Sequence, residues 1–190
     1  MSWKDSMRII EVDQENVVNK ALAFAKDAHE SIGQKRKYTG EDYIVHPIEV
    51  SQIVKSVGGS EVMQAAALLH DTVEDTNVTN AEIVEHFGPA IAKLVNELTD
   101  ISKLEDGNRA LRKEMDREHS ASASADAQTV KLADLISNSK SIVKHDPNFA
   151  KVYIREKEAL LQVLDKGNSR LHAIATKQVA DAKETLKISG

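Results

Sequence analysis

The 190-residue sequence contains no cysteine. This absence excludes disulfides, thiolate zinc sites, iron–sulfur clusters and a cysteine nucleophile, so any metal must be held by histidine and oxygen ligands. Long apolar runs are also missing: the longest, Ala65 to Leu69, is far below the roughly 18 residues of a membrane span. The N-terminal stretch MSWKDSMRII lacks the apolar segment of a signal peptide. We therefore expect a soluble, cytoplasmic protein with no membrane partner.

Aromatic residues make up only 4% of the sequence, and there are three prolines. Apolar residues are 41% and charged residues 29%, close to the averages of globular proteins, which are about 45–50% and 25%. The formal net charge is −5, whereas proteins that bind nucleic acid usually carry a concentrated basic surface. At roughly 100–200 residues per domain, the length predicts one domain over residues 1–190, with no nucleic-acid partner.

Almost every apolar stretch repeats at three and four residues, which predicts an all-α fold. We expect helices at about 14–32, 47–57, 60–69, 79–88, 89–98, 147–166 and 169–187, and one through 130–136 whose start falls near the SASASADA stretch. Residues 14–166 form the expected core of the domain, and 169–187 form a C-terminal helix. Segment 102–120 is rich in charge and poor in large apolar residues, so a solvated helix and a mobile loop both remain open.

Several residue types typical of helix ends support these boundaries. Gly33 is expected to end the first helix, and Gly88 with Pro89 to separate two others. The remaining signals are a capping box at Thr79 and Glu82, an N-cap and N1 proline at Asp146-Pro147, and an N-cap at Ser169.

The sequence AAALLHDTVEDT places four ionisable groups directly after an apolar helix. On a continuous helix, His70 would pair with Glu74, and Asp71 with Asp75, because residues four apart share a face. Charged groups on a buried helix generally need partners or a metal. The alternative is a helix end with solvated charges.

Two further residues are candidate metal ligands. His46 precedes Pro47, where an ordinary helix N-terminus is the alternative, and Asp134 lies inside the apolar helix VKLADLI, where a local pair with Lys131 is the alternative. Two imidazoles and two carboxylates suit Mn²⁺, Fe²⁺, Co²⁺ or Zn²⁺. Such a metal acidifies bound water, which Glu74 and Asp75 are placed to orient or deprotonate.

Lys35, Arg36 and Lys37 form the strongest basic cluster of this acidic chain. If their loop folds over the metal, they would bind phosphate oxygens, which predicts hydrolysis of a phosphoester or phosphoanhydride. The alternative is ordinary soluble surface. The other histidines are expected to be capping or surface residues: His29, His86, His119, His145 and His172.

Four ordered motifs resemble the HD-domain hydrolases of the RelA/SpoT homologue superfamily, of the stand-alone small alarmone hydrolase type found also in metazoans. They are HESIGQKRKYTGEDYIVHP, AAALLHDTVEDT, FGPAIAKLVNELTD and VKLADLISN, and the resemblance runs from about Ala21 to Leu164. It implies a helical HD fold and a Mn²⁺-dependent pyrophosphohydrolase. The implied substrate is a small nucleotide polyphosphate, from which the enzyme removes the 3′-diphosphate: (p)ppGpp or a related alarmone such as (p)ppApp.

The resemblance also implies roles for individual residues. The implied metal ligands are His46, His70, Asp71 and Asp134, and the acidic pair associated with the attacking water is Glu74 and Asp75. The phosphate contacts are Arg36 and Lys37, and Asn138 lies near the nucleoside. The loop from Lys37 to Tyr43 is one residue longer than in the bifunctional enzymes. Ser137 and Lys140 replace residues usual around the asparagine, so the preference for guanine or adenine stays open.

Two other functions remain open on the sequence. An HD phosphohydrolase acting on another nucleotide, a cyclic dinucleotide or NADPH would use the same metal site. A non-catalytic helical module that binds nucleotides is the alternative of a different class. The sequence leaves the oligomeric state, monomer or homo-oligomer, undetermined.

Overall fold

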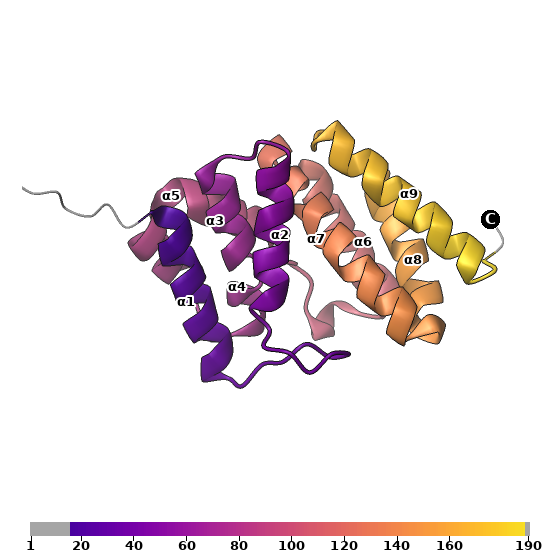
Figure 1. Cartoon of the computed structure of the whole chain (residues 1–190), viewed down its shortest axis with the longest axis horizontal. Coiled ribbons are helices and arrows are strands. Elements are labelled where there is room, and N and C mark those ends of the chain that lie inside the picture. Colours follow the sequence, from indigo (N-terminus) through magenta and orange to yellow (C-terminus); the bar gives the residue numbers. More distant parts are fainter. Residues whose placement is uncertain (1–15, 189–190) are drawn as a thin grey trace, which may run out of the picture.

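The computed structural model describes residues 16–188, and the regular structure of that range is helical, as predicted (Figure 1). Within it, the only β-type pairing is an isolated bridge between Lys35 and Asp42. The helices are α1 (Val17–Ser31), α2 (Val45–Ser56), α3 (Glu61–Leu69), α4 (Thr72–Asp75), α5 (Asn80–Leu98), the 3-10 helix η1 (Leu104–Asp106), α6 (Arg109–Ser122), α7 (Ala125–His145), α8 (Pro147–Leu161) and α9 (Ser169–Thr185).

The helix ends follow local chemistry. Thr79 and Glu82 form the predicted capping box at the start of α5. Gly88, at a φ of 80°, interrupts α5 just before Pro89, as predicted, because glycine adopts positive φ without a steric penalty. The Asp146 side chain accepts a hydrogen bond from the backbone N–H of Phe149 and so caps α8.

Three expectations at the C-terminal end and in the charged segment needed adjustment. The N-cap of α9 is Asn168, whose side chain accepts from two backbone N–H groups, and Ser169 is the first helical residue. Helix α8 ends at Leu161, earlier than the expected 166. Of the two alternatives for segment 102–120, the helix is present from Arg109 onward, as α6. In α6, the buried Asp116 accepts hydrogen bonds from the backbone N–H and the hydroxyl of Ser102.

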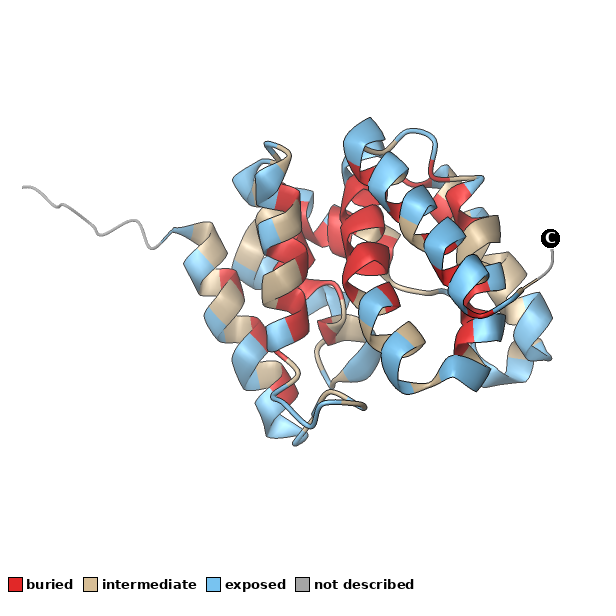
Figure 2. Ribbon diagram, turned by 45° about the vertical axis from the view of Figure 1, so that its right-hand side comes forward, coloured by how far each residue is buried: buried red, intermediate tan, exposed pale blue. Residues whose placement is uncertain are grey.

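Helices α3 and α7 form the centre of the bundle, and more than half of the residues of each are buried (Figure 2). Helix α3 packs against α1, α2, α5 and α7, and α7 packs against α2, α5, α8 and α9. Leu69, Leu132 and Leu135 are almost completely buried there. Each such side chain stabilises the fold by about 1.5–3 kcal/mol relative to an exposed position, so the two helices hold rigid positions.

The segment between α1 and α2 folds back beneath α2 toward the centre of the molecule (Figure 1). The backbone N–H of Arg36 donates to the carbonyl oxygen of Glu41 over 2.8 Å, which closes the loop on itself. Tyr43 at its end therefore lies beside the start of α2. Among the described residues, no helix combines the length and the apolar character that a membrane crossing requires.

Candidate metal centre and active site

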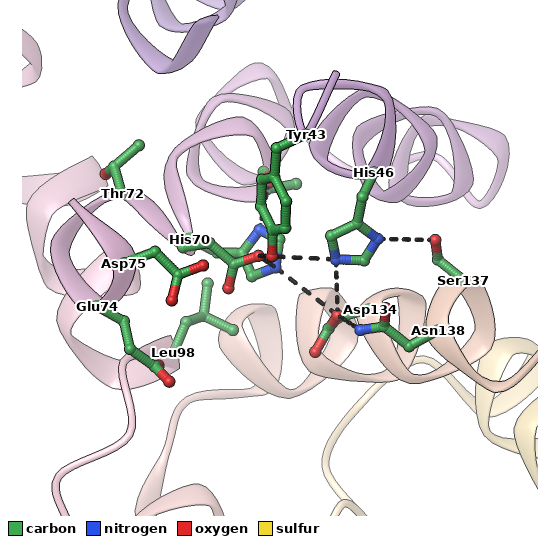
Figure 3. Close-up of polar contacts among 12 residues, drawn as sticks. Tyr43, His46, His70, Thr72, Glu74, Asp75, Leu98, Asp134, Ser137 and Asn138 are labelled. Carbon is green, nitrogen blue, oxygen red and sulfur yellow. Dashed lines mark hydrogen bonds and ion pairs between the residues drawn. The ribbon is translucent and has the colours of Figure 1, made fainter. Parts of the chain in front are cut away.

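Four of the predicted residues meet where α2, α3 and α7 converge (Figure 3). His46 lies in the first turn of α2, His70 and Asp71 connect α3 to α4, and Asp134 lies in the middle of α7. The Nε2 atom of His46 is 3.1 Å from Asp134 Oδ1, and that of His70 is 3.1 Å from Asp71 Oδ2. The two crossed distances, His46 to Asp71 and His70 to Asp134, are both 3.7 Å.

Hydrogen bonds on the far side of each ring decide which histidine nitrogens are free. His70 Nδ1 lies 2.7 Å from the carbonyl oxygen of Ala67, which can only accept, so this Nδ1 carries a proton. His46 Nδ1 lies 2.9 Å from Ser137 Oγ. Both Nε2 atoms are buried without a hydrogen-bond partner in the described part of the chain. The two Nε2 atoms thus face two carboxylates, whose negative charge a bound cation or a proton on each ring would balance.

The electrostatics of the cluster agree with this geometry. Burial alone would lower the pKa of His70, but the negative charges of Asp71 and Asp134 outweigh it and raise the pKa well above its usual value. The two carboxylates therefore attract positive charge to this point. Ligand atoms of His46, His70 and Asp134 lie within 4.8 Å of one another, and the three residues form a buried site for a divalent metal.

Tyr43 and Asn138 fix the orientation of the two carboxylates. The Tyr43 hydroxyl donates to Asp71 Oδ2 over 2.7 Å, and Asn138 Nδ2 donates to Asp134 Oδ1 over 2.7 Å (Figure 3). Sequence reasoning missed the role of Tyr43, because nothing in the spacing between it and Asp71 indicates a contact. Its position three residues before His46 is the one local signal that it lies near the site.

Glu74 and Asp75 lie on α4, beside the metal ligands and nearer the surface (Figure 3). The expected continuous helix was wrong, because α3 ends at Leu69 and a new helix begins at Thr72. Asp71 caps that new helix and accepts from the backbone N–H of Asp75 over 2.9 Å, so these two residues keep the four-residue helical spacing. Glu74 instead accepts from the backbone N–H of Asp100 over 3.3 Å. Partial burial, and then the charge of Asp100, raise the pKa of Glu74 to about 7.

Asp75 is held from the opposite side by Gln34, whose Nε2 donates to Asp75 Oδ2 over 2.9 Å. Gln34 Oε1 in turn lies 2.6 Å from His29 Nδ1. The expectation that His29 is a capping or surface residue was wrong: it is 1% exposed, and its ring lies 4.7 Å from that of Tyr43. Burial raises the pKa of Asp75, and the hydrogen bond from Gln34 opposes that rise.

Arg36 and Lys37, the two basic residues predicted to contact phosphate, point in different directions. Both terminal nitrogens of Arg36 lie 3.3 Å from Asn138 Oδ1, which brings this guanidinium to the ligand Asp134. Lys37 Nζ lies 3.8 Å from Asp146 Oδ2 and 5.8 Å from the centre of the Phe149 ring. Lys37 is therefore directed toward the junction of α7 and α8.

A cavity of about 550 Å³ between α6, α7 and α8 adjoins this region. Its basic lining residues outnumber the acidic ones: Arg109, Lys113, Arg117, Lys131, Arg155 and Lys157 against Asp100, Glu114, Asp116 and Glu156. Lys131 does not form the expected local ion pair with Asp134 but pairs with Asp100 over 3.5 Å.

Two of these cations, Arg155 and Lys157, have no carboxylate within ion-pair distance among the described residues. The ammonium of Lys157 lies 4.9 Å from the centre of the Tyr153 ring. Burial, and then the charge of Lys131, lower the pKa of Lys157. A cavity with such a cation is suited to an anionic ligand. Sequence reasoning missed this cavity, because its basic residues come from separate helices and form no cluster along the chain.

Comparison with known proteins agrees with this geometry. The family model described as "HD domain" matches residues 21–164. A protein of Brucella ovis named GTP pyrophosphokinase rsh is 38% identical over 131 residues, which are 67% of this chain and 17% of that protein. The chain therefore spans about a sixth of the length of such relatives.

A shorter relative is covered along most of its length. The protein of Xenopus tropicalis named guanosine-3′,5′-bis(diphosphate) 3′-pyrophosphohydrolase MESH1 is 39% identical over 135 residues, which are 69% of this chain and 72% of that protein. The solved structure of a metazoan ortholog of SpoT that hydrolyzes ppGpp matches with a TM-score of 0.77 at 27% identity, covering 87% of this chain and 94% of that one. The chain thus belongs to the HD-domain family and is similar to proteins of the SpoT and MESH1 type.

Proposed function

We propose that this protein is a metal-dependent pyrophosphohydrolase that removes the 3′-diphosphate of (p)ppGpp or of a related alarmone such as (p)ppApp. The observation that carries the proposal is the pair of buried Nε2 lone pairs of His46 and His70 aimed at two carboxylates. The name of the Xenopus tropicalis relative and the description of the solved structure of the metazoan SpoT ortholog support the substrate class. The proposal also keeps two expectations from the sequence: Mn²⁺ as the metal and a cytoplasmic location.

In this reaction, water attacks the phosphorus attached to the 3′ oxygen. The bond between that oxygen and the phosphorus breaks, and the 3′ oxygen is displaced and takes a proton. Pyrophosphate, which now carries the oxygen of the attacking water, is released. A divalent metal held by His46, His70, Asp134 and, as the proposed fourth ligand, Asp71 supplies Lewis acidity and lowers the pKa of water.

The residues of the chain handle the proton and the charge. Glu74, with a pKa of about 7, is matched to take a proton from water near neutral pH. Asp75 Oδ2 already accepts a hydrogen bond from Gln34, so Asp75 Oδ1 is the oxygen available to orient water. The Arg36 guanidinium, held at Asn138, is placed to neutralise charge that develops on the phosphate.

The basic cavity is proposed to take the remainder of the nucleotide polyphosphate. Its volume of about 550 Å³ falls within the roughly 300–1,000 Å³ of small-molecule sites. Lys157 has no carboxylate partner among the described residues, and Lys113 of α6 and Lys131 of α7 also line the cavity. Lys37, near the Phe149 ring that also lines the cavity, is proposed to contact phosphate from the rim. Asn138 is proposed to lie near the nucleoside.

The test is a substrate panel with protein that has been stripped of metal and then reloaded with Mn²⁺. We expect pyrophosphate from ppGpp or ppApp with Mn²⁺, no turnover without it, and slower turnover of NADPH and cyclic dinucleotides. Faster turnover of another nucleotide would favour a different HD phosphohydrolase. Nucleotide binding without any turnover would favour the non-catalytic module.

Two variants connect the activity to the site. Asp71→Ala is expected to abolish turnover while the helical circular dichroism spectrum is retained, because Asp71 is proposed to hold the metal. Asp27→Ala is the matched control, since Asp27 is exposed on α1. Full activity of Asp71→Ala would contradict the proposed ligand role.

A further inference from the structure

We propose that Glu49 and Ser137 form a hydrogen-bonded relay that sets the proton of His46 and thereby the metal affinity of the centre. The inference rests on the metal site of the proposed function and assigns positioning roles to two residues outside the ligand set. Ser137 lies on α7, and Glu49 lies on α2 one turn after His46. The contact between Ser137 and His46 is drawn in Figure 3.

The direction of each hydrogen bond in the relay follows from the chemistry of the groups. Ser137 Oγ lies 2.8 Å from Glu49 Oε2, and a carboxylate can only accept, so the single hydroxyl proton points to Glu49. The lone pair of Ser137 Oγ then faces His46 Nδ1 at 2.9 Å and must accept a proton from it. The relay therefore fixes the proton on Nδ1 and leaves the lone pair on Nε2, toward Asp134.

Burial makes this arrangement consequential for the metal. His46 is 2% exposed and Ser137 is 3% exposed, so the hydrogen bond between them is shielded from bulk solvent. Glu49 is nearer the surface, where its Oε1 lies 3.8 Å from the ammonium of Lys140.

The other histidine of the centre has no such dependence on a side chain. His70 Nδ1 donates to the backbone carbonyl of Ala67, one turn earlier on the same helix, and no substitution removes that acceptor. The two ligands are thus oriented by different means. Of the two histidines, only His46 is oriented by another side chain.

Removal of the Ser137 hydroxyl would leave His46 Nδ1 without an acceptor. The proton is then better placed on Nε2, which is 3.1 Å from Asp134 Oδ1 and would donate to it. Nε2 would no longer offer a lone pair, and metal binding would first have to reverse the tautomer. We expect the affinity for metal to fall by about 10–100-fold, the range typical of residues that orient metal ligands.

The experiment measures the dissociation constant for Mn²⁺ alone, by competition with a chelator, in the full chain and without substrate. Ser137→Ala is expected to weaken binding by about 10–100-fold. Ser137→Thr keeps the hydroxyl, and Glu49→Gln keeps an acceptor for it. Both variants are expected to bind Mn²⁺ with an affinity close to that of the original protein. Glu49→Ala is expected to weaken binding less than Ser137→Ala. Ser139→Ala is the matched control, because its hydroxyl donates to the carbonyl of Leu135 on the same helix.

A double variant separates a relay from two unrelated effects. Once Ser137 is alanine, Glu49→Ala is expected to cause no further loss of Mn²⁺ affinity, because its effect passes through the hydroxyl. The melting temperature of the metal-free variants shows that they are folded. Additive losses in the double variant would overturn the relay.

The His46→Ala variant distinguishes a failure of the relay from a failure of the proposed metal centre. If Ser137→Ala binds Mn²⁺ as tightly as the original protein while His46→Ala does not bind it, the metal centre stands and the relay is wrong. If His46→Ala also binds normally, the metal centre itself is wrong, and the relay falls with it.

Discussion

The Tyr43 hydroxyl lies 2.7 Å from Asp71 Oδ2 and donates its proton to that oxygen. Burial, and then the charge of Asp71, raise the pKa of Tyr43 above its usual range, so the hydroxyl keeps its proton at every working pH. The ring of Tyr43 also packs against the buried ring of His29. Tyr43 thereby joins the segment between α1 and α2 to the connection between α3 and α4, and it holds Asp71 toward the two histidines.

Tyr43→Phe tests this contact, because it removes the hydroxyl and keeps the ring. We expect the affinity for Mn²⁺ and the turnover to fall by about tenfold, the lower end of the range for residues that orient metal ligands. The measurement is a metal titration followed by assays at saturating metal. Tyr38→Phe serves as a control for a loop tyrosine directed to Asp146 instead. Unchanged metal affinity in Tyr43→Phe would mean that Asp71 needs no support.

Gln34 offers a second test, because it bridges His29 and Asp75. We expect Gln34→Ala to lower kcat by up to about tenfold with little change in KM, since one hydrogen bond contributes about 0.5–1.5 kcal/mol. Gln52→Ala, at an exposed position on α2, is the matched control. An increase of KM with unchanged kcat would indicate that Gln34 acts in substrate binding rather than through Asp75.

The pH dependence of turnover tests the role of Glu74. A general base must be ionised, so activity is expected to rise as the pH increases through the pKa of Glu74. The charge of Asp100 raises that pKa, so Asp100→Asn should lower it and move the acid limb of the profile to lower pH, by roughly one unit. A profile of kcat/KM from pH 5 to 9 measures this shift. An unmoved limb would exclude Glu74 as the titrating group.

The sequence predicted most of the fold because helix formation depends on local patterns. The capping box at Thr79 and the break at Gly88 each depend on residues within one turn of the chain. The cap of α9 was misplaced by one residue, because Asn168 and Ser169 are both good N-caps and only the backbone decides between them.

The site was predictable where charged residues interrupt apolar helices, as at His70 and Asp134. It was not predictable where the contact joins distant segments. Glu49 and Ser137 are 88 positions apart, and the burial of His29 depends on a loop that folds back over the end of its helix. Such contacts follow from the packing of the bundle, which no local spacing encodes.

The loop that precedes α9 packs closely against α7, and this contact offers a test of the packing of the bundle. A Cβ atom at Gly167 would lie 2.7 Å from Leu132 Cδ1 and 3.2 Å from the backbone carbon of Gln128. We expect Gly167→Ala to destabilise the protein by about 1–3 kcal/mol, the usual cost of overpacking. Urea unfolding measures the change. Stability equal to that of the original protein would show that α9 moves away from α7 without penalty.

Asp100 also governs the acid stability of the fold. Burial alone would raise its pKa, but Lys131 and Lys113 outweigh this effect and hold the pKa at about 2. The unfolded chain has a value of about 3.9, so between these two values the unfolded state binds more protons than the folded state. The stabilisation is therefore complete above about pH 5 and is lost as the pH falls through the folded-state pKa of about 2. Its size is on the order of 2 kcal/mol.

Asp100→Asn isolates this contribution, because it removes the titrating group and keeps the size of the side chain. The difference in unfolding free energy between the original protein and the variant is expected to be largest above pH 5 and to shrink steadily toward pH 2. Urea titrations at several pH values measure this difference. Carboxylates that do not contact Asp100 titrate equally in both proteins and cancel in the comparison, whereas the change in the titration of Glu74 is centred near neutral pH, above the range in which Asp100 titrates. A difference as large at pH 2.5 as at pH 6 would show that Asp100 stabilises the fold through its shape rather than its charge, since a protonated Asp100 no longer attracts Lys113 and Lys131.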